Sequence, residues 1–332
     1  MRISIVTPAP PGSRLGNRVS AERWARILRR LGHRVTIDTA TAGAPCDLLV
    51  ALHARKSAAA VRRSRRESPR RPIVLALTGT DVYRDIHRSA AARRALVLAD
   101  RLIVLQPLAT RELPRPLRHK ARVIYQSVRP VGRRDPRPTT AFRVCVLGHL
   151  RAVKDPFRAA LAVRRLPVAS RIEVVHAGAA LSPSMARRAR AESARNPRYR
   201  WFGDLSHSRA MELLARSDVL VLSSRLEGGA NVIGEALAHG VPVIASRIPG
   251  SVGLLGPRYP GYFPVGDTAR LAALLLRAER DPAYRTRLRH ACDRRARLLT
   301  PARERRAWAA LLRELTPARG SVTKGRPAAA SV

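Results

Sequence analysis

The sequence predicts an α/β protein of two domains, each built around a parallel β-sheet. Short apolar runs alternate with helical patterns through the first half of the chain, which is typical of a parallel sheet with crossover helices. A proline-rich segment follows, and a second series of the same kind begins after it. With 332 residues, the chain is long enough for two domains that each have a core.

The first series starts with a strand at residues 3–6, followed by a loop at 7–18 and a helix from about residue 20 to residue 31. Gly32 and His33 end that helix. Further strands are predicted at 35–37, 48–52, 73–77, 102–105 and 123–125. Together these elements predict an N-terminal Rossmann-like domain over residues 1–128.

Residues 129–140 contain three prolines and few apolar side chains, so we predict that they link the two domains. The second series has strands at 142–147, 172–176, 199–202, 219–222 and 241–245. Its helices are predicted at 156–166, 183–195, 207–216, 230–239, 267–280 and 282–298. This pattern predicts a second Rossmann-like domain over residues 141–300.

A closing helix is predicted over residues 301–316. Pro301 favours a helix start, and Trp308, Leu311 and Leu312 lie on one apolar stripe together with Leu315. The tail at 317–332 is small, polar and basic, which predicts disorder.

The formal net charge of +41 raises the question of a nucleic-acid-binding function. Only four of the 64 basic residues are lysines, and the arginines are spread over helix faces throughout the chain. No zinc-finger spacing, aromatic RNA-binding motif or basic heptad is present. The pattern therefore favours a biased codon usage over a selected binding patch, and we expect no nucleic-acid partner.

Neither composition nor targeting signals predict a membrane protein. No apolar stretch approaches the roughly 20 residues that span a bilayer, and the first apolar run is too short for a signal peptide. Cys46, Cys145 and Cys292 lack metal-site spacing and suit a reducing compartment. We therefore expect a cytoplasmic protein without stable membrane insertion.

The segment 217–245 carries the clearest functional pattern. Glu227 and Glu235 are separated by seven residues, with Gly228 and Gly229 between a buried strand and a short helix. The glycines free the backbone so that the helix can direct its N-terminal amides at an anion, and a carboxylate beyond can accept hydrogen bonds from ribose hydroxyls. The residues thus favour a nucleotide site over an ordinary βαβ turn with two solvated carboxylates.

The loop after the first strand also has features of an anion site. Gly12 and Gly16 are spaced as in a phosphate-binding loop, and Arg14, Asn17 and Arg18 add hydrogen-bond donors. The spacing is not Gly-x-Gly-x-x-Gly, so a nicotinamide site is disfavoured. A plain surface loop is the alternative interpretation.

Two further loops of the first domain follow strand ends, where open α/β sheets bind ligands. His53, Arg55 and Lys56 follow one strand. Thr80, Asp81 and Arg84 follow the next. Because these hydroxyls and cations gather at the same edge of the sheet, we expect them to contact a substrate, although a lone His at a strand end is often structural.

In the second domain, Gly148 is followed by His149, Arg151 and Lys154. Gly203 and Arg225 come after two later strands. Together with the Glu-x7-Glu spacing of Glu227 and Glu235, this loop resembles the family 4 glycosyltransferases of the GT-B fold, in which two Rossmann-like domains face each other across a cleft.

That resemblance implies a role for each matching position. Glu227 would contact the donor sugar, Glu235 the ribose, and Lys154 the diphosphate, while His149 stands where the family carries an arginine. The implied donor-binding residues are Gly12, Gly16, Asn17, His149, Arg151, Lys154, Gly203, Arg225, Glu227, Gly228, Gly229, Ala230, Asn231 and Glu235. No Asp-x-Asp is present, so we expect no divalent metal and no other cofactor.

Five segments together resemble a narrower group, the selenosugar synthases of bacterial selenoneine biosynthesis (SenB): 6–19, 51–57, 76–85, 148–156 and 223–232. The resemblance spans residues 1 to about 315. It implies transfer of the sugar of UDP-N-acetylglucosamine or UDP-glucose to selenophosphate, with a new carbon–selenium bond. Enzymes that produce selenophosphate and consume the selenosugar would be pathway partners.

On this interpretation the acceptor-binding residues are Ser13, Arg14, Arg18, His53, Arg55, Thr80, Asp81 and Arg84, and the catalytic residues are Lys154, Glu227, Arg18 and His53. Selenophosphate is already an anion with a soft nucleophile, so positioning and charge neutralisation matter more than a general base. The alternative functions are a GT-B enzyme with a lipid or polysaccharide acceptor at an anionic membrane and a nucleic-acid-binding protein.

Overall fold

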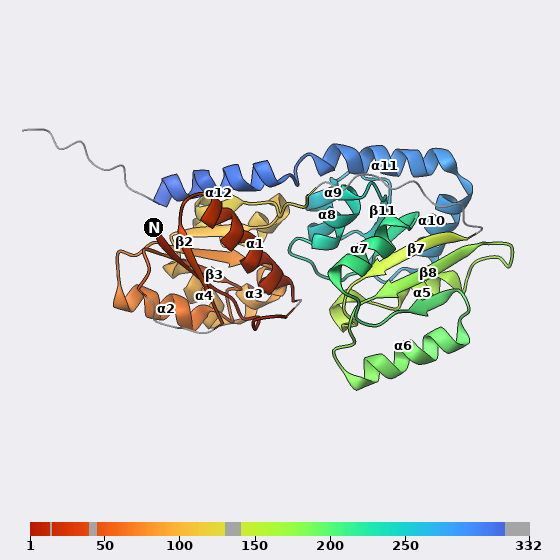
Figure 1. Cartoon of the computed structure of the whole chain (residues 1–332), viewed down its shortest axis with the longest axis horizontal. Coiled ribbons are helices and arrows are strands. Elements are labelled where there is room, and N and C mark those ends of the chain that lie inside the picture. The colour runs from red at the N-terminus through yellow and green to blue at the C-terminus, as the bar shows by residue number, and fades with distance from the viewer. Residues whose placement is uncertain (14, 40–44, 130–140, 316–332) are drawn as a thin grey trace, which may run out of the picture.

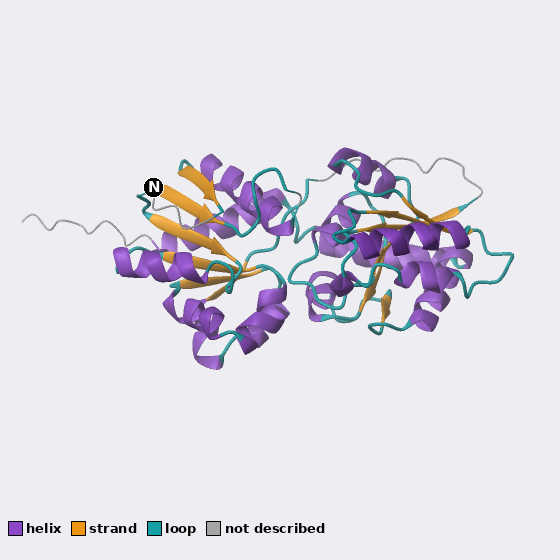
Figure 2. Ribbon diagram, turned by 90° about the horizontal axis from the view of Figure 1, so that it is seen from below, coloured by secondary structure: helices purple, strands orange, loops and turns teal. Residues whose placement is uncertain are grey.

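The computed structural model describes residues 1–13, 15–39, 45–129 and 141–315. Nearly all of the predicted linker 129–140, and the whole predicted tail 317–332, lie outside these residues. Within the described ranges the chain forms two bodies, each with its own sheet (Figure 1). Figure 2 shows helices on both faces of each sheet.

The N-terminal domain has a six-stranded parallel sheet in the order β2-β1-β3-β4-β5-β6. Its strands are β1 Arg2–Val6, β2 Arg34–Asp38, β3 Leu48–Leu52, β4 Ile73–Leu77, β5 Arg101–Val104 and β6 Ala121–Val123. Its α-helices are α1 Gly16–Arg30, α2 Ala58–Glu67, α3 Ile86–Arg88 and α4 Ala90–Leu98. A π-helix at Asp81–Asp85 and 3₁₀ turns at Pro107–Glu112 and Arg115–Lys120 complete the domain.

The C-terminal domain repeats this plan with the order β12-β11-β10-β7-β8-β9. Its strands are β7 Phe142–Leu147, β8 Ile172–Ala177, β9 Tyr199–Trp201, β10 Val219–Leu222, β11 Val243–Ser246 and β12 Tyr262–Phe263. Its helices are α5 Arg158–Val163, α6 Pro183–Arg195, α7 His207–Ala215, α8 Asn231–Ala238, α9 Pro249–Leu255, α10 Thr268–Arg280 and α11 Pro282–Ala296. The last helix, α12 Pro301–Leu315, returns along the N-terminal domain (Figure 1).

In both sheets the strand order reverses direction beside the first strand of the domain, between β1 and β3 and between β7 and β10. Ligands of open α/β sheets bind at the carboxyl ends of the strands at such a reversal. The topology therefore places the loops after β1, β3, β7 and β10 where a ligand is expected.

The central strands are buried because helices cover both faces of each sheet, whereas the edge strands β2 and β6 are partly exposed. All five residues of β3 and of β4 are buried, which is the continuous apolar pattern of parallel strands. A large core and a small cluster around Phe157 lie in the C-terminal domain, and two cores lie on opposite faces of the N-terminal sheet. These features confirm the predicted α/β class with two Rossmann-like domains.

Several predicted boundaries differ from the structure. The first helix begins at Gly16, not near Ser20, because the Ser20 hydroxyl donates to the Gly16 carbonyl inside the helix at 2.9 Å and does not cap it. β6 ends at Val123, not at Tyr125, because its partner β5 ends at Val104, which lies opposite Val123. The short elements α9 and β12 were not predicted.

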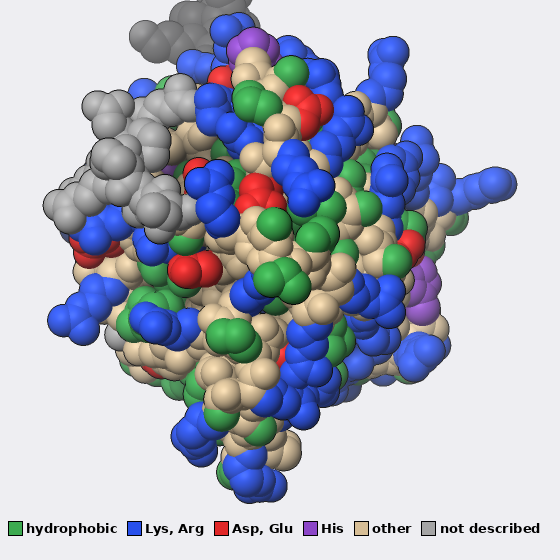
Figure 3. Space-filling model, turned by 90° about the vertical axis from the view of Figure 1, so that its right-hand side faces the viewer, with side chains coloured by type: hydrophobic (Ala, Val, Ile, Leu, Met, Phe, Trp, Pro, Cys, Tyr) green, Lys and Arg blue, Asp and Glu red, His purple; other side chains and the backbone are tan. Residues whose placement is uncertain are grey.

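Lys and Arg side chains are spread over the surface that a space-filling view shows (Figure 3). Figure 3 shows Lys and Arg side chains scattered across the exposed face, interrupted by apolar and acidic side chains. This distribution agrees with the even spread of arginine along the sequence. No helix in the described part of the chain is both long and apolar enough to cross a membrane.

One buried carboxylate fastens α12 to the N-terminal domain. Glu304 is 2% exposed and accepts hydrogen bonds from the Trp24 indole nitrogen at 2.8 Å and from the Ser127 backbone amide at 2.9 Å. The Ser127 hydroxyl donates to the same carboxylate at 2.5 Å. Beside it, the Trp24 and Trp308 rings pack edge to face with centroids 5.2 Å apart. Glu304 thereby joins α1, α12 and the last described residues before the interdomain segment.

We expect Glu304→Gln to lower the free energy of unfolding of the N-terminal domain by about 2 kcal/mol, because the new amide group would face buried donors that then lack an acceptor. Urea unfolding followed by tryptophan fluorescence measures this loss. The matched control is Glu173→Gln at an exposed position of β8, which should change stability little. Equal stability of the two variants would contradict the proposed anchoring role.

Candidate functional site

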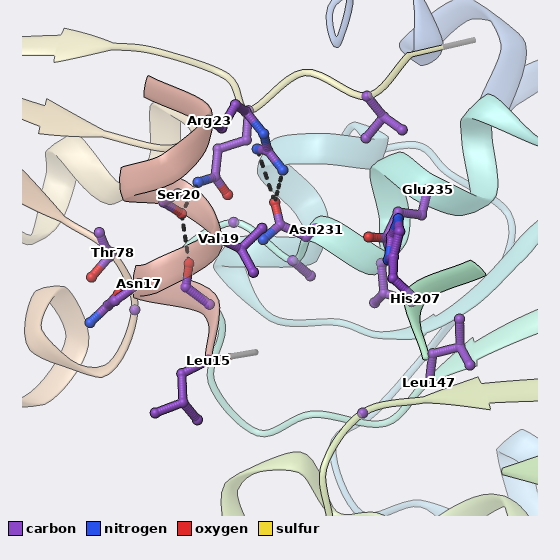
Figure 4. Close-up of a pocket in the computed structure, with 18 of the residues that line it drawn as sticks. Leu15, Asn17, Val19, Ser20, Arg23, Thr78, Leu147, His207, Asn231 and Glu235 are labelled. Atoms are coloured by element: carbon purple, nitrogen blue, oxygen red, sulfur yellow. Dashed lines mark hydrogen bonds between the residues drawn. The ribbon is translucent and has the colours of Figure 1, made fainter. Parts of the chain in front are cut away.

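A cavity of about 1480 Å³ lies between the two domains. The loops after β1, β3 and β4 line it from the N-terminal side, and the loops after β7, β8 and β10 line it from the C-terminal side. Helices α1, α7 and α8 and the first turn of α12 complete the walls. Figure 4 shows side chains from α1 and α8 pointing toward each other across this space. The cavity thus lies where both strand reversals predict a ligand.

The two domains touch through glycines of the turn that follows β10. A Cβ atom on Gly228 would lie 2.7 Å from the Thr78 carbonyl oxygen and 2.8 Å from the Gly79 amide nitrogen. A Cβ atom on Gly229 would lie 2.7 Å from the Leu105 Cβ. Since real Cβ atoms do not approach so closely, only glycine permits this backbone contact. The contact joins the Glu227 turn directly to the loop after β4.

Glu227 and Lys154 form an ion pair in the cavity. The Ser224 hydroxyl donates to the same Glu227 oxygen, Oε1, at 2.6 Å. Ser223 donates to the Asp155 carbonyl at 2.8 Å and so holds the Lys154 turn against the end of β10. The Glu227 side chain is only 11% exposed. A fixed carboxylate and an ammonium group thus lie side by side at the reversal of the C-terminal sheet, and the donor-binding roles predicted for them stay predictions.

Glu235 lies one helical turn beyond Asn231 on α8 and faces His207 of α7 (Figure 4). Burial raises the pKa of Glu235, and the nearby His207, Arg23 and His239 oppose that shift. The Asn231 side-chain oxygen accepts hydrogen bonds from Arg23 Nη1 at 3.2 Å and Nη2 at 3.3 Å. An arginine of the N-terminal domain therefore reaches the helix that carries Glu235.

A buried histidine of β8 holds the loop after β7 in place. His176 Nε2 lies 3.1 Å from the Gly148 carbonyl, and its Nδ1 lies 2.9 Å from the Tyr199 hydroxyl. Complete burial lowers the pKa of His176 to about 4, so the ring is neutral near neutral pH. His149 itself lines the cavity, and its Nδ1 accepts from the Ala179 amide at 3.1 Å, which places the proton of the neutral ring on Nε2.

A cationic cluster forms the N-terminal wall. Asp85 accepts a hydrogen bond from Arg55 Nε at 3.0 Å and from Arg84 Nε at 3.4 Å, and His53 Nε2 lies 3.7 Å from Asp85 Oδ2. Burial works against the Asp85 carboxylate, but the hydrogen bond and charge of Arg55 outweigh it and lower the Asp85 pKa. Burial lowers the pKa of His53, which Asp81 and Asp85 only partly offset. His53 has a backbone φ of 76°, a strained conformation for a non-glycine residue.

Asp81 braces this cluster and does not face the cavity. Its carboxylate is completely buried and accepts from the amides of Ala54 at 2.9 Å, Thr78 at 3.1 Å and Gly79 at 2.8 Å. These bonds fix the loops after β3 and β4 relative to each other. The carboxylate predicted to bind the acceptor is thus occupied by backbone amides.

The structure brings most of the predicted residues together. The cavity is lined by Gly16, Asn17, His53, Arg55, Thr80, Arg84, His149, Arg151, Lys154, Glu227, Gly229, Ala230, Asn231 and Glu235. Gly12, Ser13, Arg18, Asp81, Gly203, Arg225 and Gly228 are not among its lining residues. Arg14 lies outside the described residues.

Arg18 is displaced from the cavity by a local ion pair. Its Nε lies 2.6 Å from the Glu22 carboxylate one turn later on α1, and its Nη1 is buried without a hydrogen-bond partner among the described residues. Gly228 is absent from the lining because the N-terminal domain covers it. The roles predicted for these residues stay predictions.

Sequence reasoning missed several cavity residues. Arg23, Arg26 and Arg30 of α1 line the wall, as do His207 of α7 and Arg305 of α12. The spacing of the α1 arginines by three and four residues places them on one helix face, which is a signal visible in the sequence. The part played by α12 was not visible, because only the tertiary structure brings its first turn back to the cleft.

No group of three or more His, Cys, Asp or Glu side chains is placed to hold a metal ion within the ranges that the structure describes.

Two Rossmann-like domains with a cavity between the carboxyl ends of their sheets are the arrangement of the GT-B fold. The chain belongs to the family described as "Glycosyl transferases group 1", which matches residues 132–298. No curated protein matches the sequence significantly.

Solved structures support the same fold. HepE from Anabaena in complex with UDP-glucose has a TM-score of 0.75 at 17% identity, covering 95% of this chain and 100% of that one. Sucrose-phosphate synthase from Thermosynechococcus elongatus has a TM-score of 0.75 at 17% identity, with coverage of 95% and 98%. A glycosyltransferase from Rickettsia africae has a TM-score of 0.73 at 14% identity, with coverage of 95% and 98%. The predicted GT-B fold is thereby confirmed.

We expect Gly228→Ala to weaken the contact between the domains, because the added methyl group would collide with the backbone of Thr78 and Gly79. Overpacking of this kind costs about 1–3 kcal/mol. Urea unfolding and the radius of gyration from small-angle X-ray scattering measure the change. Gly16→Ala is the control, because a Cβ there meets nothing within 4 Å. An unchanged radius and stability in Gly228→Ala would show that this contact is not needed.

Proposed function

We propose that this glycosyltransferase takes its sugar from UDP-N-acetylglucosamine or UDP-glucose and transfers it to selenophosphate. The observation that carries the acceptor assignment is the composition of the N-terminal wall. Cations line it, and the two nearby carboxylates, Asp81 and Asp85, are engaged by backbone amides and by arginines. Such a wall suits an acceptor that is already an anion.

The donor half of the proposal rests on the C-terminal wall. Glu235 would accept hydrogen bonds from the ribose hydroxyls, and the amides at the N-terminus of α8 would face the diphosphate. Lys154 would neutralise charge on the departing diphosphate, a contribution that grows in the transition state. The complex of HepE with UDP-glucose, in the same fold, supports this choice of donor. The proposal needs no divalent ion.

The pairing of Lys154 with Glu227 has a consequence for donor binding. In the structure the Lys154 ammonium already neutralises the Glu227 carboxylate. The diphosphate of an incoming UDP-sugar would compete for the Lys154 ammonium. Hydroxyl groups of the sugar would then donate hydrogen bonds to the Glu227 carboxylate in its place. Binding of the UDP-sugar would thereby replace the ion pair between Lys154 and Glu227 with contacts from each side chain to the substrate.

The acceptor half follows from the chemistry of selenophosphate. Its selenium carries negative charge and attacks the anomeric carbon without prior loss of a proton, so no free general base is required. The new carbon–selenium bond forms as the bond from that carbon to the diphosphate oxygen breaks, and UDP leaves with the electron pair. The phosphoryl group stays on selenium in the immediate product. His53, Arg55, Thr80 and Arg84 would bind the phosphoryl oxygens.

The test is incubation of the full chain with selenophosphate and each UDP-sugar in buffer containing EDTA, with products identified by mass spectrometry. We expect a selenium-containing sugar phosphate and an equal amount of UDP. UDP release with another acceptor, but none with selenophosphate, would refute the acceptor and keep the donor. Absence of UDP release with every acceptor tested would refute both.

Variants on the two walls should affect different substrates. We expect Arg84→Ala to raise the KM for selenophosphate by about 10-fold while leaving the KM for the UDP-sugar nearly unchanged, because it removes one charge-assisted contact. Lys154→Ala should lower kcat by about 100-fold, because it removes charge stabilisation of the leaving group.

Steady-state kinetics with each substrate varied in turn measure both effects. Arg88→Ala is the matched control for Arg84, since Arg88 is an exposed arginine one helical turn later that does not line the cavity. Equal effects of Arg84→Ala on both substrates would contradict the assignment of this wall to the acceptor.

A further inference from the structure

We infer that Arg23 is a positioning residue. When the cleft is closed, it orients the side chains of α8 that would bind the nucleotide. The inference rests on the proposed uridine nucleotide donor. Arg23 belongs to α1 of the N-terminal domain, whereas Asn231 and Glu235 belong to α8 of the C-terminal domain. The residue therefore acts across the cleft, on the element that would hold the ribose and the diphosphate.

The guanidinium of Arg23 fixes the orientation of the Asn231 amide. Nη1 and Nη2 both donate to Asn231 Oδ1, at 3.2 and 3.3 Å (Figure 4). An arginine has only donors, so the Asn231 oxygen must face it and the amide nitrogen must face elsewhere. Without Arg23 the amide could turn over and present its oxygen to the cavity. With Arg23 in place, Asn231 keeps its N–H donors available for an anion such as a diphosphate.

Arg23 also acts on Glu235. Asn231 and Glu235 are four residues apart on α8 and so lie on the same helix face. Arg23 is one of the charges that oppose the effect of burial on the Glu235 pKa, and Glu235 in turn opposes the effect of burial on the Arg23 pKa. The carboxylate form of Glu235, which accepts hydrogen bonds from ribose hydroxyls, is thus favoured when α1 stands close to α8.

The position of Arg23 is set by a rigid support. The next residue, Trp24, is completely buried, donates to Glu304 and packs on Trp308. α1 is therefore fixed to α12 within the N-terminal domain. When the domains separate, Arg23 moves away with α1, and both the Asn231 orientation and the charge next to Glu235 are lost. Opening of the cleft would in this way weaken the hold on UDP.

A purely structural strut between the domains is the competing explanation, and it predicts a change in stability without a change in nucleotide affinity. Isothermal titration calorimetry of UDP with the full chain separates the two. We expect Arg23→Ala and Asn231→Ala each to weaken UDP binding by about 10-fold. The double variant should lose less than the sum of the two single losses, because both substitutions break the contact between Arg23 and Asn231 and only the Arg23 substitution also removes the charge beside Glu235.

Further variants sharpen the test. Arg23→Lys should be intermediate, because a lysine keeps the charge near Glu235 but cannot donate two bonds from a planar group. Arg66→Ala, at an exposed arginine of α2 away from the cavity, is the control and should bind UDP as the natural chain does. The decrease in radius of gyration on adding UDP should be present in the natural chain and smaller in Arg23→Ala.

The UDP affinities of these variants decide between the inference and the competing explanation. UDP affinity unchanged in Arg23→Ala, with or without a lower unfolding temperature, overturns the inference and leaves the proposed donor intact. Fully additive losses in the double variant also overturn it. Failure of the natural chain to bind UDP refutes the proposed donor itself. Should Arg23→Ala fail to fold, Arg23→Lys carries the same test, because it removes the paired donation to Asn231 and keeps a long cationic side chain at this half-buried position.

Discussion

The Glu304 carboxylate connects the parts of the molecule on which the cleft depends. The chain passes between the domains twice, once beyond Ser127 and once before α12, and Glu304 binds the amide and hydroxyl of Ser127 from the first turns of that helix. Its third donor is Trp24 of α1. A buried carboxylate requires such donors, because burial without them would cost several kcal/mol. The hydrogen bonds of Glu304 therefore hold α12 against both Ser127 and α1, the helix that carries Arg23.

Glycines allow the second contact between the domains. The Glu227 turn lies against the backbone of Thr78 and Gly79, which leads into the π-helix bearing Arg84 and Asp85. The carboxylate proposed to bind the donor and the cations proposed to bind the acceptor therefore lie on loops that touch each other. Packed backbones transmit displacement because they cannot be compressed. If substrate binding shifted the loop after β10 or the loop after β4, the other loop would move as well. Such coupling suits an enzyme that must hold both substrates before the transfer.

The structure distinguishes arginines that make contacts at the cavity from arginines elsewhere on the surface. Arg23 is half-buried and bonded across the cleft, and Arg55 and Arg84 share Asp85 at the cavity wall. Other Lys and Arg side chains are scattered over the face of the molecule that Figure 3 shows. Charge in water is strongly screened, whereas charge in a concave wall of low dielectric acts at short range on a ligand. Location, not number, decides which of these residues contribute to a site.

The sequence by itself determined the α/β class and most strands, because apolar periodicity fixes them. Glu227 was singled out by its spacing around a glycine turn, and Lys154 by its match to a family motif. Only the tertiary structure decided that Asp81 binds backbone amides, that Arg18 pairs with Glu22, and that α12 returns to α1. These facts depend on residues far apart in the chain or on rotamer choices, neither of which a linear pattern records. Arg23 belongs to the same class: its helical face was readable, but its partner Asn231 lies 208 residues away.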